Sequence, residues 1–134
     1  MPAVPCPPRR LPSQVIHVAP HVVAGVGDGT AGSPWTLAEA IASVRATPPA
    51  TRPATTILLG GGRYQLHGET IELGAGDGGR AEANVVWAAA PGEVPVISGA
   101  TRLELVWTEV KGVFSAKLPG DLEPFKSIYV GGQR

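Results

Sequence analysis

The candidates for acid–base chemistry in this sequence are two glutamates, because a carboxylate can donate or accept a proton. Glu72 and Glu104 each alternate with apolar neighbours along the chain, so a β-strand at either place would point the carboxylate outward. No partner carboxylate lies at a spacing that would place it beside either glutamate. A solvated outer face is the favoured interpretation, and we assign no residue as catalytic.

The residues that might suggest a metal ion also favour a structural role. Asp28 and Asp77 each stand between two glycines, but neither continues into the Asp-x-Asp pattern of a calcium loop. Both are expected to form turns, which aspartate does readily. His17 and His21 are four residues apart, yet Pro20 prevents the helix that would place them on one face. We therefore predict no metal site.

Motifs for phosphate, a cofactor or a nucleophile are incomplete. The run Gly60–Gly62 followed by Arg63 lacks the Gly-Lys-Ser/Thr ending of a phosphate loop, so a tight corner is predicted. His67 lies among turn residues and is interpreted as a surface residue. Cys6 is the single cysteine, cannot form an internal disulfide, and is interpreted as an incidental thiol. No cofactor is expected.

We likewise assign no functional role to the aromatic side chains or to two basic ones near the end of the sequence. Trp35, Trp87 and Trp107 could stack on sugar rings, but packing in a core is the favoured role for aromatic residues on apolar strands. Trp35 also precedes a helix and is placed to act as a hydrophobic staple. Lys126 and Arg134 receive no role from their surroundings.

The element that the sequence predicts most firmly is one helix. Thr36 followed by Glu39 three residues later forms a capping box, which satisfies amide donors at a helix start. An apolar stripe follows at helical spacing, made of Leu37, Ala40, Ile41 and Val44. Pro48 and Pro49 end the helix. Because so short a helix is unstable alone, its stripe must cover an apolar surface.

Short strands are predicted on both sides of this helix, and glycine or proline stands in the gaps between them. The sequence places them at Val15–Ala19, Thr55–Leu59, Thr70–Leu73, Val85–Ala90 and Val94–Ser98, with further candidates at Leu103–Trp107, Val113–Ala116 and Ser127–Val130. Two-residue hairpin turns of the Asn-Gly type and intervening helices are both missing from the pattern. Parallel strands without helices favour a solenoid, whose repeats are typically ~20–45 residues long.

Composition limits the partners. The chain has 134 residues, enough for one small domain, with 11 basic and 11 acidic side chains. This balance gives no electrostatic footprint for nucleic acid, and no window is apolar over the ~18 residues that a membrane span requires. Residues 1–14 form a proline-rich tail that we expect to be disordered, and no secretory signal is visible in it. Residues 15–134 are expected to form the folded part.

Residues 15–134 resemble the N-terminal region of right-handed parallel β-helix proteins of the pectate-lyase-like superfamily. The landmarks are Ile16–Pro20, Gly27–Thr30, Ser33–Leu37, Thr56–Leu59 and, most specifically, Pro91–Gly99. The segments Gly112–Phe114 and Phe125–Arg134 are similar to a part of large β-helix glycoside hydrolases. Pro53-Ala54 replaces the Pro-Gly-Asp turn that is usual in the family, which affects a loop. The predicted fold is thus mainly β, the start of a right-handed parallel β-helix with one N-terminal capping α-helix.

The resemblance implies a carbohydrate-active protein whose catalytic groups lie in coils beyond Arg134. We therefore expect an N-terminal fragment, inactive by itself, of a parent that is a glycoside hydrolase acting on polysaccharide. A polysaccharide lyase parent and a non-catalytic β-solenoid module for binding or adhesion are the alternatives. A β-sandwich with antiparallel strands is a weaker one.

Partners and location follow from the same resemblance. Polysaccharide is the expected partner of the parent, and an extracellular location is usual for the family. The last coil of a truncated solenoid would be open, so self-association through that coil is also expected, together with marginal stability. The sequence does not identify the sugar.

Overall fold

The computed structural model describes residues 13–120, 122, 124 and 127–131. The predicted tail up to residue 12, Cys6, Lys126 and Arg134 lie outside the described residues. The chain divides into two compact units, Met1–Thr101 and Arg102–Arg134. Each is considered by itself.

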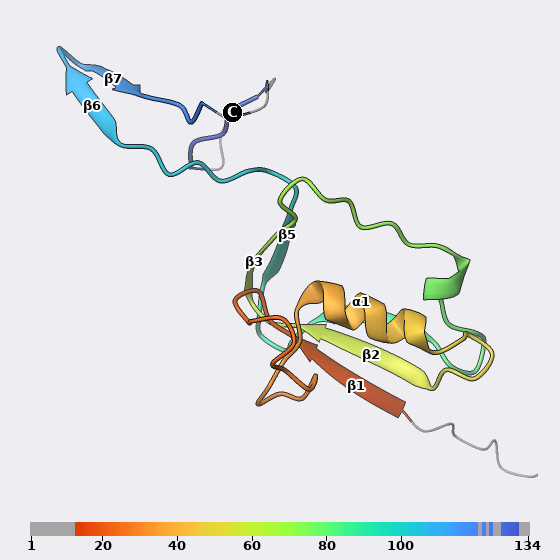
Figure 1. Ribbon diagram of the computed structural model, residues 1–134. Helices are drawn as coiled ribbons and strands as arrows, with labels where there is room; N and C mark the ends of the chain where they lie inside the picture. The colour runs from red at the N-terminus through yellow and green to blue at the C-terminus, as the bar shows by residue number, and fades with distance from the viewer. Residues whose placement is uncertain (1–12, 121, 123, 125–126, 132–134) are drawn as a thin grey trace, which may run out of the picture. The chain divides into compact units, whose positions relative to one another are not determined.

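The first unit contains a three-stranded parallel sheet in the order β1-β2-β4. Strands β1 and β2 lie side by side in Figure 1. Its strands are β1 (Ser13–Val18), β2 (Ala54–Leu59) and β4 (Val85–Ala89). The register aligns Ile16 with Ile57 and Ile57 with Trp87. The parallel pairing of these strands agrees with the arrangement that the sequence favours, and β1 begins two residues before the predicted segment.

The first unit also contains a second, two-stranded parallel sheet. One of its strands comes directly after β2 in the chain, and the other comes after β4. This sheet joins β3 (Gly62–Gln65) to β5 (Pro95–Ser98), with Tyr64 opposite Ile97. The chain thus runs through β2 and β3 and then, roughly 30 residues later, through β4 and β5 beside them, a spacing within the ~20–45 residues of a structural repeat. Within the described residues the fold is mainly β, with small sheets and one short α-helix.

The helix α1 (Leu37–Ala46) forms where the sequence predicts it. The hydroxyl of Thr36 accepts the amide of Glu39 at 3.2 Å, while the Glu39 carboxylate accepts the amide of Thr36 at 2.8 Å. This reciprocal capping box is confirmed. Ala40 and Val44 are buried, so the apolar stripe covers the core as expected.

The core of the first unit lies between α1 and the two parallel sheets. Seven buried residues form it: Ile16, Val18, Ala40, Val44, Ile57, Leu59 and Tyr64. Trp35, Leu37, Val85 and Trp87 pack against it from partly buried positions. The core therefore draws on β1, α1, β2 and β3, and the β4 side chains lie at its margin.

Two strand predictions in the described residues are wrong. Thr70–Leu73 has the alternation of a strand but forms none, and the strand is instead β3, which follows directly on the glycine run. Gly62 begins β3 with φ of +120°, a conformation that glycine adopts without a side-chain clash. Ser127–Val130 also forms no strand; the short 3₁₀-helix η1 (Ala75–Asp77) was not foreseen.

The second unit contains one antiparallel hairpin, formed by β6 (Trp107–Val110) and β7 (Val113–Ala116). Lys111 and Gly112 connect the strands with φ of +52° and +79°, the positive values of a type I′ turn. The sequence has no Asn-Gly turn here, and Lys111 takes the place usually held by asparagine, so the search for Asn-Gly turns missed this hairpin. The Leu103–Trp107 alternation yields a strand only from Trp107 onward.

Candidate functional site

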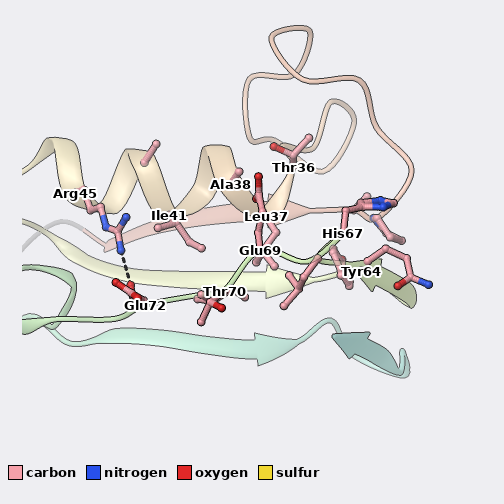
Figure 2. Close-up of a pocket in the computed structure, with 16 residues that line it drawn as sticks. Thr36, Leu37, Ala38, Ile41, Arg45, Tyr64, His67, Glu69, Thr70 and Glu72 are labelled. Carbon is pink, nitrogen blue, oxygen red and sulfur yellow. Dashed lines mark hydrogen bonds between the residues drawn. The ribbon is translucent and has the colours of Figure 1, made fainter. Parts of the chain in front are cut away.

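The first unit contains a groove of about 790 Å³, which is within the size range of ligand pockets. One wall is α1, and the other is formed by β3 and the segment that follows it as far as Glu72 (Figure 2). Leu37 and Ile41 point from the helix toward the opposite segment. The capping box and the apolar stripe thus position one wall of the groove.

The opposite wall carries polar groups of several kinds. His67, Glu69, Thr70 and Glu72 line the groove from exposed positions, and Ile71 adds apolar surface between them. His67 has φ of +48°, which turns the chain between β3 and this wall. The wall offers an imidazole, a hydroxyl and two carboxylates beside an apolar strip, a combination suited to hydrogen bonding with a polar organic ligand.

Arg45 crosses the groove at its far end and joins three elements. Its Nη2 donates to the backbone oxygen of Glu72 at 2.6 Å (Figure 2). Its Nε donates to Asp77 Oδ1 at 2.6 Å. The hydrogen bond with Arg45 lowers the pKa of the Asp77 carboxyl, and the amide of Gly74, which donates to Asp77 Oδ2 at 2.8 Å, lowers it further. The hydrogen bond between Arg45 and Asp77 also raises the pKa of Arg45.

Tyr64 lines the groove and is also a core residue. Its hydroxyl lies 2.8 Å from the oxygen of Gly60 and 3.0 Å from the oxygen of Val18. Burial raises the pKa of this phenol, with the nearby Glu93 charge adding to the effect, so the hydroxyl keeps its proton as a donor. The neighbouring Gln65 has a buried Oε1 that accepts no hydrogen bond in the described part of the chain.

Arg52 holds the loop beyond the groove to the end of α1. Its side chain is 2% exposed and donates to three backbone oxygens, at Thr47 (Nε, 3.0 Å; Nη2, 2.6 Å), at Gly76 (Nη2, 2.8 Å) and at Gly78. These contacts span the residues before β2 and the η1 turn. Four of the five N–H donors of this buried guanidinium bond to backbone oxygens, so its role is to fix the backbone.

The aspartates singled out in the sequence have the predicted structural roles. Asp28 Oδ1 accepts from the amide of Thr30 at 3.0 Å and from its hydroxyl at 2.7 Å, which is an Asx turn. These two bonds lower the pKa of Asp28. Asp77 closes η1 and pairs with Arg45. His17 lies on β1, where its backbone bonds to Gly29 and Trp35, and His21 is exposed in the next loop.

Tryptophan packing follows the prediction in the first unit. Trp35 and Trp87 pack on the core, and Trp35 Nε1 donates to the oxygen of Gly27 at 2.9 Å. Trp107, on β6, is 52% exposed, so its predicted place in a core is wrong. The exposure follows from the hairpin, whose strand β6 has no buried face.

The two candidate glutamates are found in different units. Glu72 belongs to the first and lines the groove, where its backbone oxygen accepts from Arg45. Glu104 belongs to the second unit, is exposed, and lies 3.8 Å from Arg102. Glu69, which shares the groove with Glu72, was missed because it stands in a glycine turn without alternation.

We searched the described part of the chain for metal-ligating clusters and for membrane-spanning helices and found neither. No group of three or more histidine, cysteine, aspartate or glutamate side chains is placed there to hold a metal ion. Likewise, none of the helices within the described ranges is long and apolar enough to cross a membrane.

Comparison with known proteins gives one informative similarity. The chain is similar to a solved structure of a glycoside hydrolase, with a TM-score of 0.67 and 26% sequence identity over 79% of this chain. It has the fold of a part of that protein and spans 18% of its length. No protein-family model matches the sequence, and no curated protein matches it significantly.

Proposed function

We propose that this chain forms the capped first coils of a right-handed parallel β-helix in a carbohydrate-active protein whose complete form is a glycoside hydrolase. The observation that carries the proposal is the parallel placement of β4 beside β2 and of β5 beside β3. Strands that repeat in this way, without helices to bring the chain back, stack as coils of a solenoid. The similarity to part of a glycoside hydrolase supports the same conclusion.

The proposed fold suits a polymeric sugar because outward side chains of adjacent coils repeat every ~4.8 Å along the stack. Two carboxylates on neighbouring or next-nearest coils reach the separations of ~5–5.5 Å or ~6.5–9.5 Å that retaining and inverting glycosidases use. A pair of that kind needs several coils. In our proposal the carboxylates lie in later coils, and the present chain supplies the start of the stack.

In this proposal α1 has a covering role. Ala40 and Val44 seal the core beside β1, so the first coil meets the helix and not water. Covering the end of a sheet in this way prevents unwanted strand pairing. The groove between α1 and Glu72 is a secondary feature, to which we assign no catalysis.

The test is to read the coding sequence beyond codon 134 and to express the longest open product beside the 134-residue chain. We expect strand pairs that continue at roughly 30-residue intervals, with outward aspartates or glutamates on neighbouring coils. The longer product is expected to release reducing sugar from at least one member of a polysaccharide panel, and the 134-residue chain from none.

Two results would contradict the proposal. Hydrolysis by the purified 134-residue chain would place the catalytic groups within it. A continuing repeat with polar outer faces but no carboxylate pair, together with polysaccharide binding without hydrolysis, would favour the non-catalytic module instead. Replacing each outward carboxylate by its amide in the longer product is the matched control for an active enzyme.

A further inference from the structure

The groove beside α1 has two chemically different walls. Four apolar side chains of the helix line one wall: Leu37, Ala38, Ile41 and Ala42. Ala38 and Ala42 are exposed, so this apolar strip is open to a ligand. The opposite wall, which ends at Glu72, presents polar side chains. A ligand that fills the groove therefore needs one apolar side and one polar side.

The polar wall is held in place at both ends. At one end the amide of Glu69 donates to the oxygen of Leu66 at 2.8 Å, across a turn in which His67 has a positive φ. At the other end Arg45 Nη2 donates to the backbone oxygen of Glu72 at 2.6 Å. A wall that is fixed before binding loses less conformational entropy when a ligand arrives.

The side chains of this wall accept hydrogen bonds more than they donate them. The carboxylates of Glu69 and Glu72 are acceptors only, while Thr70 and His67 can each accept or donate. A matching ligand has to supply several hydrogen-bond donors along one edge.

The charge of the lining narrows the choice of ligand. Its charged residues are Arg45, Glu69 and Glu72. Arg45 forms its ion pair with Asp77, at 2.6 Å, and Asp77 stands outside the lining. The groove is therefore negative in balance, which disfavours a ligand of the same sign.

We propose that this groove is a non-catalytic binding site for a short stretch of an uncharged polysaccharide. A pyranose ring has a face of C–H groups, which suits the apolar strip of α1, and a rim of hydroxyl groups, which can donate to Glu69 and Glu72. A glycan built of uronic acids carries carboxylates that these two side chains repel. The inference rests on the proposed function for the class of ligand and adds a site and a charge preference to it.

This site does not depend on how the chain continues. All lining residues lie between Ala19 and Glu72, so they belong to the first unit and precede β4 in the chain. The later coils of the proposed β-helix stack beside β4 and β5, which contribute no residue to the lining.

The test is a nuclear magnetic resonance titration of the ¹⁵N-labelled 134-residue chain with four tetrasaccharides. Xylotetraose, cellotetraose and mannotetraose are neutral, and tetragalacturonate is the acidic probe of equal length. We expect at least one neutral probe to bind with a dissociation constant on the order of 1 mM, and tetragalacturonate to bind at least about tenfold more weakly. The amide signals of Ala42 and Thr70 are expected to move, while those of Val15 and Trp87, which lie outside the groove, stay in place.

Paired glutamine variants test the charge preference. Glu69→Gln combined with Glu72→Gln removes both charges and keeps an acceptor at each position. It is expected to leave neutral binding within about threefold and to tighten tetragalacturonate binding about tenfold. Glu82→Gln is the matched control, because Glu82 is exposed in the same unit but outside the groove, and it is expected to change neither affinity by more than about twofold.

A measurement on the unchanged chain avoids any effect of substitution on folding. At about 1 M NaCl the Debye length is only ~3 Å, so the difference in affinity between neutral and acidic probes should narrow. A difference that is insensitive to both salt and the paired glutamine substitutions would overturn the charge preference.

Other results would overturn the site itself. Failure of all three neutral probes to bind at tens of millimolar would do so, as would shifts confined to residues outside the groove. Tighter binding of a basic peptide such as Lys-Leu-Lys-Leu would assign the groove to cationic peptides instead. Hydrolysis by the longer product without binding in the groove would overturn this inference alone, whereas binding in the groove without continuing coils would overturn only the proposed function.

Discussion

Replacing Arg52 by methionine should destabilise the first unit strongly. Methionine keeps an apolar stem of similar length but leaves the oxygens of Thr47, Gly76 and Gly78 without their donor. Hydrogen bonds to charged groups contribute about 1.5–3 kcal/mol each. Three acceptors lose such bonds, and the removal of a buried charge offsets part of that loss. We expect the free energy of unfolding to fall by about 3 kcal/mol, a large share of the 5–15 kcal/mol typical of a domain.

Urea unfolding monitored by tryptophan fluorescence measures this change. A Trp107→Phe background removes the emission of the second unit and leaves Trp35 and Trp87, which pack on the core. Arg63→Met is the matched control, because Arg63 is exposed and makes one 3.3 Å bond to Ser98. We expect the control to change stability by less than about 0.5 kcal/mol. Equal losses in both variants, or no loss for Arg52→Met, would refute the role assigned to Arg52.

Three further changes test the local structure. Thr36→Ala removes the capping hydroxyl and should cost about 1 kcal/mol in urea unfolding. Asp77 has a lowered pKa in the folded state, so its contribution is present above its ordinary pKa of 3.8 and is lost as the pH falls through the lowered folded value. Asp77→Asn should therefore be less stable than the unchanged chain at neutral pH, with the difference shrinking in acid titrations. Gly29→Ala should destabilise more than Gly25→Ala, since both have φ of +79° but only at Gly29 would the new Cβ meet the Trp35 ring, at 3.0 Å. Equal thermal shifts for the two alanine variants would contradict that contact.

Local patterns predicted the elements that depend on neighbours in the sequence. The capping box and stripe of α1 lie within one helix, and the apolar runs of β2 and β4 are compatible with strands wherever they pair. By contrast, β3 consists of a glycine, an arginine, a tyrosine and a glutamine, and it becomes a strand by pairing with β5. Thr70–Leu73 alternates like a strand but has no partner strand in the described residues.

The site was harder to predict because its contacts join residues far apart in the sequence. Arg45 on α1 bonds to Asp77 in η1. Arg52, which precedes β2 in the chain, bonds to the backbone oxygens of Gly76 and Gly78. No spacing rule connects such pairs. Glu69 enters the groove through the turn at His67, whose positive φ is unusual for a residue other than glycine.

The measurement that most directly tests the central claim is a set of interstrand nuclear Overhauser contacts in the first unit. Stacked coils require parallel pairing, with Ile57 beside Trp87 and Tyr64 beside Ile97. We expect contacts between the amide and Hα protons of these strands in the parallel pattern and register. Close Hα–Hα contacts across β2 and β4, or across β3 and β5, would show antiparallel strands and would contradict the β-helix on which the proposed function depends.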